Sequence, residues 1–163
     1  MTTYRVLIVD DSRLMRQVLT DMVAADGSFT VEATASNGEE AVRLALELRP
    51  DIITMDLEMP QMNGLEALRR IMAVRPTPVI MLSAVTDNGA RDTIKALQYG
   101  AFDFVRKPDR AVQLDIGEVS KFLLEKLHVA AESISRGTLR MLPAVEEEAG
   151  PRPPQIADPG PPI

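Results

Sequence analysis

The chain contains no cysteine and only one histidine among its 163 residues. Without cysteine, the protein has no thiol nucleophile, no disulfide and no thiolate ligand for a metal. This absence is typical, though only weakly, of a reducing compartment, so we expect the cytoplasm. No apolar run is long enough to span a bilayer, and the first ten residues lack the apolar core and cleavage site of a signal peptide. We therefore expect neither membrane insertion nor export.

An excess of positive charge is also absent. The formal net charge is −6, and three of these units lie after Leu142, where Glu146, Glu147, Glu148 and Asp158 outnumber Arg152. The remaining part is only mildly acidic, which argues against a nucleic-acid surface. Apolar residues make up 45% of the chain, enough for one domain with a proper core.

Apolar, β-branched runs alternate with amphipathic stretches five times along the chain. The runs are Tyr4 to Val9, Thr30 to Thr34, Ile52 to Met55, Pro78 to Leu82 and Phe102 to Val105. Helical spacing is seen in Leu14, Val18 and Met22; Ala41, Leu44 and Leu48; Leu65, Leu68 and Met72; Ile94, Leu97 and Gln98; and from about Gln113 to Ser133. Parallel strands need crossover helices, so this alternation predicts an α/β fold with a doubly wound parallel sheet.

Residues with chemically useful side chains follow four of these runs. They are Asp10 and Asp11, Asp56, Ser83 and Lys107. In open parallel sheets, ligands bind outside the carboxyl ends of the strands, where the strand order reverses. The sequence therefore predicts that carboxylates, a hydroxyl and an ammonium meet at one site.

The chemistry of this set favours phosphoryl transfer. Three carboxylates brought together repel each other unless a cation is bound, and oxygen ligands without histidine select a hard ion such as Mg²⁺. A carboxylate can act as the nucleophile and form an aspartyl phosphate. Asp56 is the best nucleophile because it stands alone after the expected central strand, with Glu58 in the loop beside it. Mg²⁺, Lys107 and Ser83 would then stabilise the transferring group.

These motifs resemble those of response regulator receiver domains. The resemblance covers about Tyr4 to Ala131 and rests on Val-Asp10-Asp11-Ser, Met-Asp56-Leu-Glu-Met-Pro-Gln-Met-Asn-Gly, Met-Leu-Ser83-Ala and Val-Arg-Lys107-Pro108. It implies a flavodoxin-like sheet with strand order 2-1-3-4-5 and five helices.

The resemblance also implies a role for each site residue. Asp56 would be phosphorylated from a histidine kinase, and Lys107 would contact the phosphoryl group. Asp11, Asp56 and the main-chain carbonyl of Glu58 would ligate Mg²⁺, and Asp10 would assist through water.

A switch is implied as well. Ser83 would move toward the phosphoryl oxygens while Phe104 changes rotamer. The face formed by the fourth helix, the last strand and the last helix would then change.

A narrower resemblance is to the regulatory half of chemotaxis protein-glutamate methylesterases. It rests on Asp-Leu-Glu58-Met-Pro, Gly64-Leu-Glu-Ala-Leu, the run from Gly100 to Pro108, and Gln-Leu-Asp115-Ile. It implies a receiver domain over residues 1–133 and a proline-rich disordered linker over 134–163, with the downstream effector domain missing from this chain. The partners would be a chemotaxis histidine kinase and the chain's own C-terminal effector, with phosphorylation relieving inhibition of the esterase.

The chain itself is not expected to hydrolyse esters. Such an enzyme needs a serine in a glycine-rich turn with a histidine base and an aspartate. The only histidine, His128, has no second histidine at helical spacing and is expected to be a solvated helix residue. Self-phosphorylation and dephosphorylation at Asp56 are the only reactions expected of this chain.

Other interpretations remain open at this stage. Asp10 and Asp11 alone would be ordinary N-cap residues, and Ser83 and Lys107 alone ordinary surface residues. The receiver could belong to a DNA-binding response regulator or stand alone in chemotaxis. A Mg²⁺-dependent phosphatase of the haloacid dehalogenase type is a further alternative, but such enzymes place Asp-x-Asp after the first strand.

Overall fold

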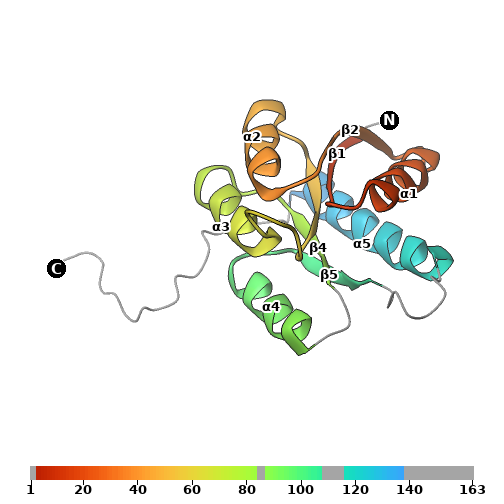
Figure 1. Cartoon of the computed structure of the whole chain (residues 1–163). Helices are drawn as coiled ribbons and strands as arrows, with labels where there is room; N and C mark the ends of the chain where they lie inside the picture. Colours follow the sequence, from red (N-terminus) through yellow and green to blue (C-terminus); the bar gives the residue numbers. More distant parts are fainter. Residues whose placement is uncertain (1–2, 84–86, 108–115, 138–163) are drawn as a thin grey trace.

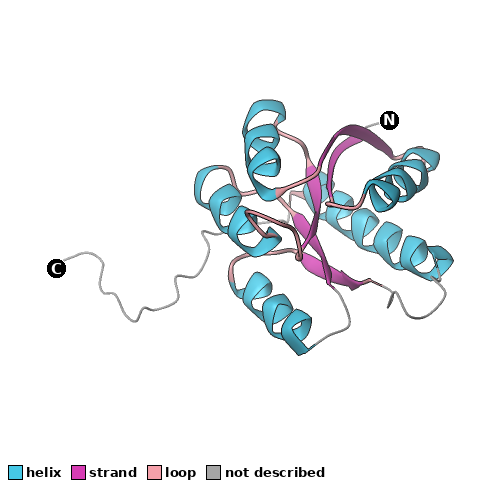
Figure 2. Cartoon of the chain, in the orientation of Figure 1, coloured by secondary structure: helices cyan, strands magenta, loops and turns pink. Residues whose placement is uncertain are grey.

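The computed structural model describes residues 3–83, 87–107 and 116–137. Five strands alternate with five helices, as the sequence predicts (Figure 2). The strands are β1 (Tyr4–Val9), β2 (Phe29–Ala35), β3 (Ile52–Asp56), β4 (Val79–Ser83) and β5 (Asp103–Arg106). The helices are α1 (Arg13–Ala25), α2 (Gly38–Leu48), α3 (Gly64–Val74), α4 (Asp87–Gln98) and α5 (Ile116–Arg136).

The strands form one parallel sheet in the order β2-β1-β3-β4-β5. The expected strand order is therefore confirmed, and β3 is the central strand. Every residue of β3 and of β4 is buried, which explains why both are almost wholly apolar. The strand order reverses between β1 and β3, so the fold places its ligand crevice at their carboxyl ends.

Helices cover both faces of the sheet (Figure 1). On one face, α2, α3 and α4 pack through residues such as Ala45, Leu68 and Ala96 onto Leu7, Ile53 and other strand residues of the same core cluster. On the other face, α1 and α5 pack through Leu19, Val23, Leu123 and Leu127 onto Val6, Ile8, Ile80 and Leu82. Alternate residues of β1, β3 and β4 thus serve opposite cores.

Two helices bury a different face from the one that their apolar spacing suggests. Leu14 of α1 is 67% exposed, and Leu19 and Val23 are the buried residues of this helix. In α4, Ile94 and Leu97 are exposed, whereas Thr93 and Ala96 are buried. The buried side chains of α4 are small or polar. The positions of its larger apolar residues therefore do not predict which face of the helix is buried.

The last helix ends at Arg136, three residues beyond the expected Ser133. Ile134 still packs against the α1/α5 core cluster, so the helix continues as long as it has apolar surface to bury. Residues 134–136, which were expected to begin the disordered linker, instead belong to α5. The expected first residues of the helix, 113–115, and the rest of the predicted linker from residue 138 onward lie outside the described residues. No helix in the described part of the chain has the length and apolar character needed to cross a membrane.

Candidate functional site

Four strand ends bring the expected residues together. Asp10 follows β1, Asp56 is the last residue of β3, Ser83 is the last of β4, and Lys107 follows β5. The parallel register aligns these ends, since Asp56 pairs with Leu82 and Ser83 with Arg106. The main-chain N–H of Lys107 donates to the carbonyl of Ser83, with 2.7 Å between the two atoms. The site is thus a direct consequence of the sheet topology.

Asp10 is fully buried and is fixed by the start of α1. Its Oδ1 accepts a hydrogen bond from the main-chain N–H of Ser12 at 2.9 Å, and the Ser12 hydroxyl caps α1 by accepting from the N–H of Met15. Arg16 reaches back from the first turns of α1, and its Nη1 donates to the main-chain carbonyl of Asp10 at 2.8 Å. Asp11, the next residue, is exposed at the mouth of the site.

Lys107 bridges the two buried carboxylates. Its Nζ lies 3.2 Å from Oδ2 of Asp10 and 3.2 Å from Oδ2 of Asp56. The lysine side chain is 19% exposed, so its ammonium is held between two groups that have little contact with water. Charge-assisted hydrogen bonds of this kind are stronger than neutral ones and fix the ammonium in place.

Burial dominates the electrostatics of Asp56. It raises the pKa of Asp56 from 3.8 to about 7, and the nearby charge of Asp10 adds to the rise, while Lys107 and the N–H of Glu58 oppose it. For Lys107, burial lowers the pKa, but Asp56 and then Asp10 outweigh that effect, so its pKa lies above the ordinary value. Lys107 therefore stays charged at neutral pH, whereas Asp56 without a further cation is partly protonated.

The donor set fits a hard divalent cation. One oxygen atom from each of Asp10, Asp11 and Asp56 lies within 4.8 Å of the others. Three carboxylates face one ammonium, so full ionisation leaves excess negative charge in a largely buried place, as the raised pKa of Asp56 reflects. All the donors are oxygen atoms, which Mg²⁺ prefers. The residues present therefore suit the ion that the sequence predicted.

The loop after β3 turns tightly beneath Asp56. The N–H of Glu58 donates to Oδ1 of Asp56 at 3.2 Å, and the N–H of Gly64 donates to the carbonyl of Leu57 at 3.0 Å. A Cβ at Gly64 would lie 2.1 Å from the main-chain oxygen of Asp56, closer than any side chain can approach. Gly64 therefore allows α3 to begin directly against the strand that carries Asp56. The side chain of Glu58 itself is exposed.

Ser83 has a hydrogen-bond partner that was not predicted from the sequence. Its hydroxyl accepts a hydrogen bond from the hydroxyl of Thr93 on α4, with 2.8 Å between the oxygens, and both residues are buried. A signal was present in the sequence, because Thr93 shares the i, i+3 spacing of the small residue Ala96. Its significance emerges only when α4 is seen to turn this face to the sheet.

Phe104 and His128 have no described contact with Asp10, Asp11 or Asp56. Phe104 is 39% exposed on β5, opposite Met81 of β4. His128 is half-exposed on α5, and its Nε2 lies 2.8 Å from Oδ2 of Asp26, with its ring edge-on to Phe29. The expectation that His128 is a solvated helix residue agrees with this exposure, and its carboxylate partner comes from the C-cap of α1, which helical spacing does not indicate. Ser28 and then His128 hold the pKa of Asp26 below its ordinary value.

Comparisons with known proteins agree with this geometry. Residues 6–115 match the family model of the response regulator receiver domain. A protein-glutamate methylesterase/protein-glutamine glutaminase from Carboxydothermus hydrogenoformans is 50% identical over 141 residues, which are 86% of this chain and 39% of that protein. The chain thus spans about two fifths of this curated relative.

Two solved structures are similar in fold and in sequence. The response regulator domain of Thermotoga maritima CheB has a TM-score of 0.74 and 48% identity, and the match covers 80% of this chain and 97% of that one. A chain of the CheX–CheY–BeF₃–Mg²⁺ complex from Borrelia burgdorferi has a TM-score of 0.65 and 32% identity, covering 78% and 89%.

Proposed function

Because the chain belongs to the response regulator receiver domain family, we propose that it is a phosphorylation-controlled switch in which Asp56 accepts the phosphoryl group. The observation that carries this proposal is the position of Asp56. Its carboxylate lies at the end of the central strand, 3.2 Å from Nζ of Lys107 and within 4.8 Å of oxygens from Asp10 and Asp11. Asp56 is the one carboxylate residue that ends a strand in the described part of the chain.

In the proposed reaction, one oxygen of Asp56 attacks the phosphorus of a phosphohistidine. The bond from phosphorus to the imidazole nitrogen breaks as the new oxygen–phosphorus bond forms, so the product is an aspartyl phosphate. Lys107 holds the nucleophilic carboxylate before the reaction and contacts a phosphoryl oxygen after it. Asp10 keeps the ammonium of Lys107 in position through its own 3.2 Å contact.

Mg²⁺ would be held by the side chains of Asp11 and Asp56 and the main-chain carbonyl of Glu58, with Asp10 assisting through water. When bound, the ion would offset the negative charge that spreads over the phosphoryl oxygens. The three acidic side chains supply the oxygen donors for it. Their mutual repulsion is also what favours ion binding.

Ser83 and Phe104 form the proposed switch. The hydroxyl of Ser83 leaves Thr93 and binds a phosphoryl oxygen, and the ring of Phe104 moves from its half-exposed position into the space that is freed. Phe104 has no hydroxyl, so its part in the switch is steric. The altered face is formed by α4, β5 and α5, which is where a partner would be gained or lost.

We place this receiver in a chemotaxis pathway, as the regulatory half of a protein-glutamate methylesterase. The names and identity of its relatives support this output over a DNA-binding one. The phosphodonor is a chemotaxis histidine kinase in the cytoplasm, and phosphorylation of Asp56 relieves inhibition of the attached esterase. We expect that the chain by itself does not hydrolyse glutamyl methyl esters, because that reaction needs a serine in a glycine-rich turn with a histidine base and an aspartate.

Intact-mass spectrometry after incubation with acetyl phosphate and Mg²⁺ tests the proposal. Wild type should gain the mass of one phosphoryl group, and Asp56→Asn should gain none. The control Asp21→Asn changes an exposed carboxylate on α1 in the same way and should label like wild type. Omitting Mg²⁺ should abolish labelling of wild type and of Asp21→Asn. Equal labelling of Asp56→Asn and wild type would refute the assignment of Asp56.

A further inference from the structure

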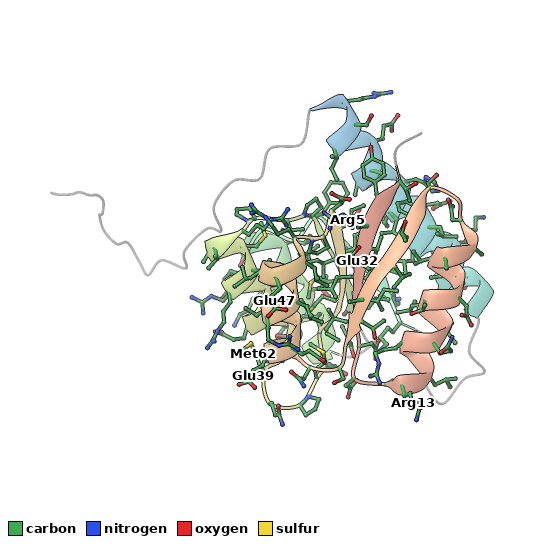
Figure 3. The ribbon with its side chains drawn as sticks, turned by 90° about the horizontal axis from the view of Figure 1, so that it is seen from above. Arg5, Arg13, Glu32, Glu39, Glu47 and Met62 are labelled. Atoms are coloured by element: carbon green, nitrogen blue, oxygen red, sulfur yellow. The ribbon has the colours of Figure 1, made fainter. Side chains whose placement is uncertain are left out.

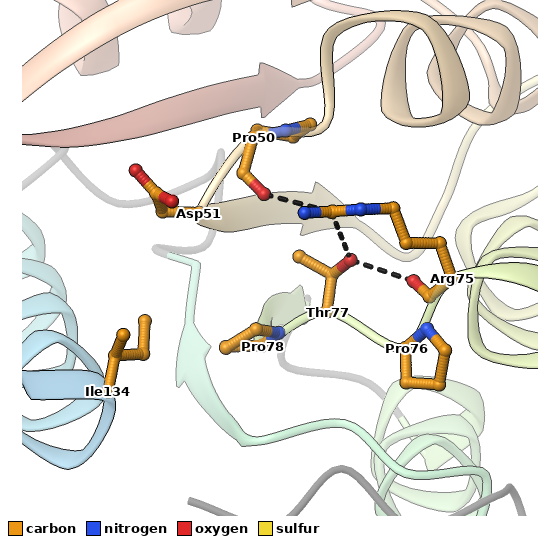
Figure 4. Close-up of a pocket in the computed structure, with 7 residues that line it drawn as sticks. All are labelled: Pro50, Asp51, Arg75, Pro76, Thr77, Pro78 and Ile134. Atoms are coloured by element: carbon orange, nitrogen blue, oxygen red, sulfur yellow. Dashed lines mark hydrogen bonds between the residues drawn. The ribbon is translucent and has the colours of Figure 1, made fainter. Parts of the chain in front are cut away.

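A cavity lies near the amino ends of β3 and β4, at the end of the sheet opposite Asp56. It has a volume of about 260 Å³ and is lined by the residues that precede β3 and β4 and by the last turns of α5 (Figure 4). The lining residues are Pro50, Asp51, Arg75, Pro76, Thr77, Pro78 and Ile134. Three prolines and Ile134 give it apolar walls, and Arg75 and Asp51 give it charge.

Three arginines surround Asp51 at this end of the sheet. Arg75 donates from Nη1 to the carbonyl of Pro50 at 3.1 Å and to the hydroxyl of Thr77 at 3.0 Å (Figure 4). Arg5 begins in β1 at the end of the sheet far from Arg13, Glu39 and Met62 (Figure 3), and its Nε lies 3.6 Å from Oδ2 of Asp51. Arg49 is exposed beside Pro50. We call Arg5, Arg49 and Arg75 the arginine cluster.

The arginine cluster carries more positive charge than its surroundings offset. Burial lowers the pKa of Arg75, and Arg49 and Arg5 lower it further, whereas Asp51 opposes the shift. The guanidinium of Arg75 is therefore close enough to Arg49 and to Arg5 to be repelled by both, with the carboxylate of Asp51 opposing that repulsion. Among the described residues, the hydrogen bonds of the Arg75 side chain both involve Nη1, and a guanidinium has five N–H donors in all. Arg5 already donates from Nη1 to the carbonyl of Leu48 and from Nη2 to that of Arg49. A further acidic group would relieve the repulsion and find donors ready.

The chain carries such a group a short distance beyond α5. Ile134 lines the cavity, and α5 ends at Arg136 with the chain beside the cavity rim. Glu146, Glu147 and Glu148 begin ten residues later, in the segment outside the described residues. Ten residues can span up to about 35 Å, more than twice the radius of gyration of about 14 Å expected for a domain of this size. The tether is thus long enough to return the acidic run to the cluster.

We propose that the acidic run Glu146–Glu148 binds the arginine cluster. Exposed ion pairs contribute only about 0.2–1 kcal/mol each, so a free acidic peptide would bind poorly. A short tether raises the effective concentration to the millimolar range, which favours docking within one chain. The proposal does not depend on phosphorylation.

Backbone amide NMR spectra of the 163-residue chain test this docking. Relative to wild type, the triple variant E146Q/E147Q/E148Q should shift the resonances of Arg49, Asp51, Thr77 and Ile134 and leave those of α1 in place. Added NaCl should move the same resonances in wild type and have little effect in the triple variant, because salt screens exposed ion pairs. The control Asp158→Asn, which removes a charge from the same segment, should match wild type. Coinciding spectra of wild type and the triple variant would overturn the proposal.

Two further arms identify the docking partners. Arg49→Gln removes one exposed charge of the cluster and should reduce the salt-sensitive shifts. If it leaves them unchanged, the acidic run binds elsewhere and the proposal fails. Dilution should not alter the wild-type spectrum, because the contact lies within one chain. Shifts that disappear on dilution would instead indicate pairing of two chains and would contradict the proposal.

Discussion

The hydroxyl of Thr93 donates a hydrogen bond to the hydroxyl of Ser83, with 2.8 Å between the two oxygens. Thr93 lies on α4 and Ser83 at the end of β4, so the bond ties this helix to the residue proposed to move on phosphorylation. Both side chains are buried, and breaking the bond without a replacement is costly. Thr93 therefore stabilises the resting position of Ser83.

Replacing Thr93 by valine should favour the activated state. Valine keeps the shape of threonine but removes the donor, which costs the resting state about 1 kcal/mol. We expect Thr93→Val to bind the phosphate mimic beryllofluoride, with Mg²⁺, up to about fivefold more tightly than wild type. Thr93→Ser keeps the hydroxyl and serves as the matched control. Unchanged or weaker binding by Thr93→Val, measured by calorimetry, would show that the bond does not restrain Ser83.

Substituting Gly64 should disturb the site through the backbone. The new Cβ in Gly64→Ala would meet the main-chain oxygen of Asp56 at 2.1 Å, so α3 or β3 must shift. We expect a loss of about 2 kcal/mol or more in the free energy of unfolding. A Cβ at Gly27 meets nothing within 4 Å, so Gly27→Ala should change it by less than about 0.5 kcal/mol. Urea unfolding compares the two variants, and equal stabilities would contradict the close approach.

The pH dependence of stability should reveal the raised pKa of Asp56. Burial raises this pKa from 3.8 to about 7, so without metal the folded state holds a proton that the unfolded state releases. The resulting stability is complete below about pH 4 and is lost as the pH rises through about 7. A pKa unit corresponds to about 1.4 kcal/mol. The free energy of unfolding of Asp56→Asn should therefore exceed that of wild type by roughly 1–4 kcal/mol at pH 8 with chelator present.

Asp26 provides a control of opposite sign for this experiment. The N–H of Ser28 and then His128 lower its pKa, so its contribution is present above the unfolded pKa and is lost as the pH falls. Asp26→Asn should therefore lower stability at pH 8, where Asp56→Asn raises it. Urea unfolding at pH 5 and pH 8 measures both effects. If Asp56→Asn is less stable than wild type at pH 8, ionisation of the Asp56 carboxylate does not destabilise the folded wild-type protein.

Removing the Lys107 side chain should allow phosphorylation of Asp56 but prevent the conformational change that follows it. Lys107→Ala leaves the nucleophile and the acidic side chains in place, so acetyl phosphate should still label the protein. The ammonium that would link the phosphoryl group to β5 is lost, so the amide resonances of Phe104 and Phe122 should no longer respond to beryllofluoride. The control Lys126→Ala removes a lysine that pairs with Asp103 at the surface and should respond normally. A normal response in Lys107→Ala would exclude this role.

The parallel sheet and the meeting of Asp10, Asp56 and Lys107 were predictable from the sequence for a clear physical reason, whereas the strand order came from the resemblance to receiver domains. Wholly apolar strands alternating with amphipathic helices restrict the fold to a parallel sheet, and parallel strands end at one edge. Residues placed directly after such strands must then meet, whatever the details of helix packing.

Contacts that depend on helix rotation or on distant segments were not predictable in this way. Thr93 reaches Ser83 only because α4 turns a small, polar face to the sheet and leaves Ile94 exposed. His128 and Asp26 are 102 residues apart in sequence, so no local spacing indicates their contact. The arginine cluster likewise joins residues from β1, the end of α2 and the end of α3.

The central claim is that Asp56 carries the phosphoryl group, and locating that group chemically tests it most directly. Borohydride reduces an aspartyl phosphate to homoserine, which peptide mass spectrometry can assign to one position after treatment with acetyl phosphate and Mg²⁺. The account predicts homoserine at position 56 in wild type, and at no position in protein treated without Mg²⁺. Homoserine at position 10 or 11, or phosphate retained on Ser83, would contradict it.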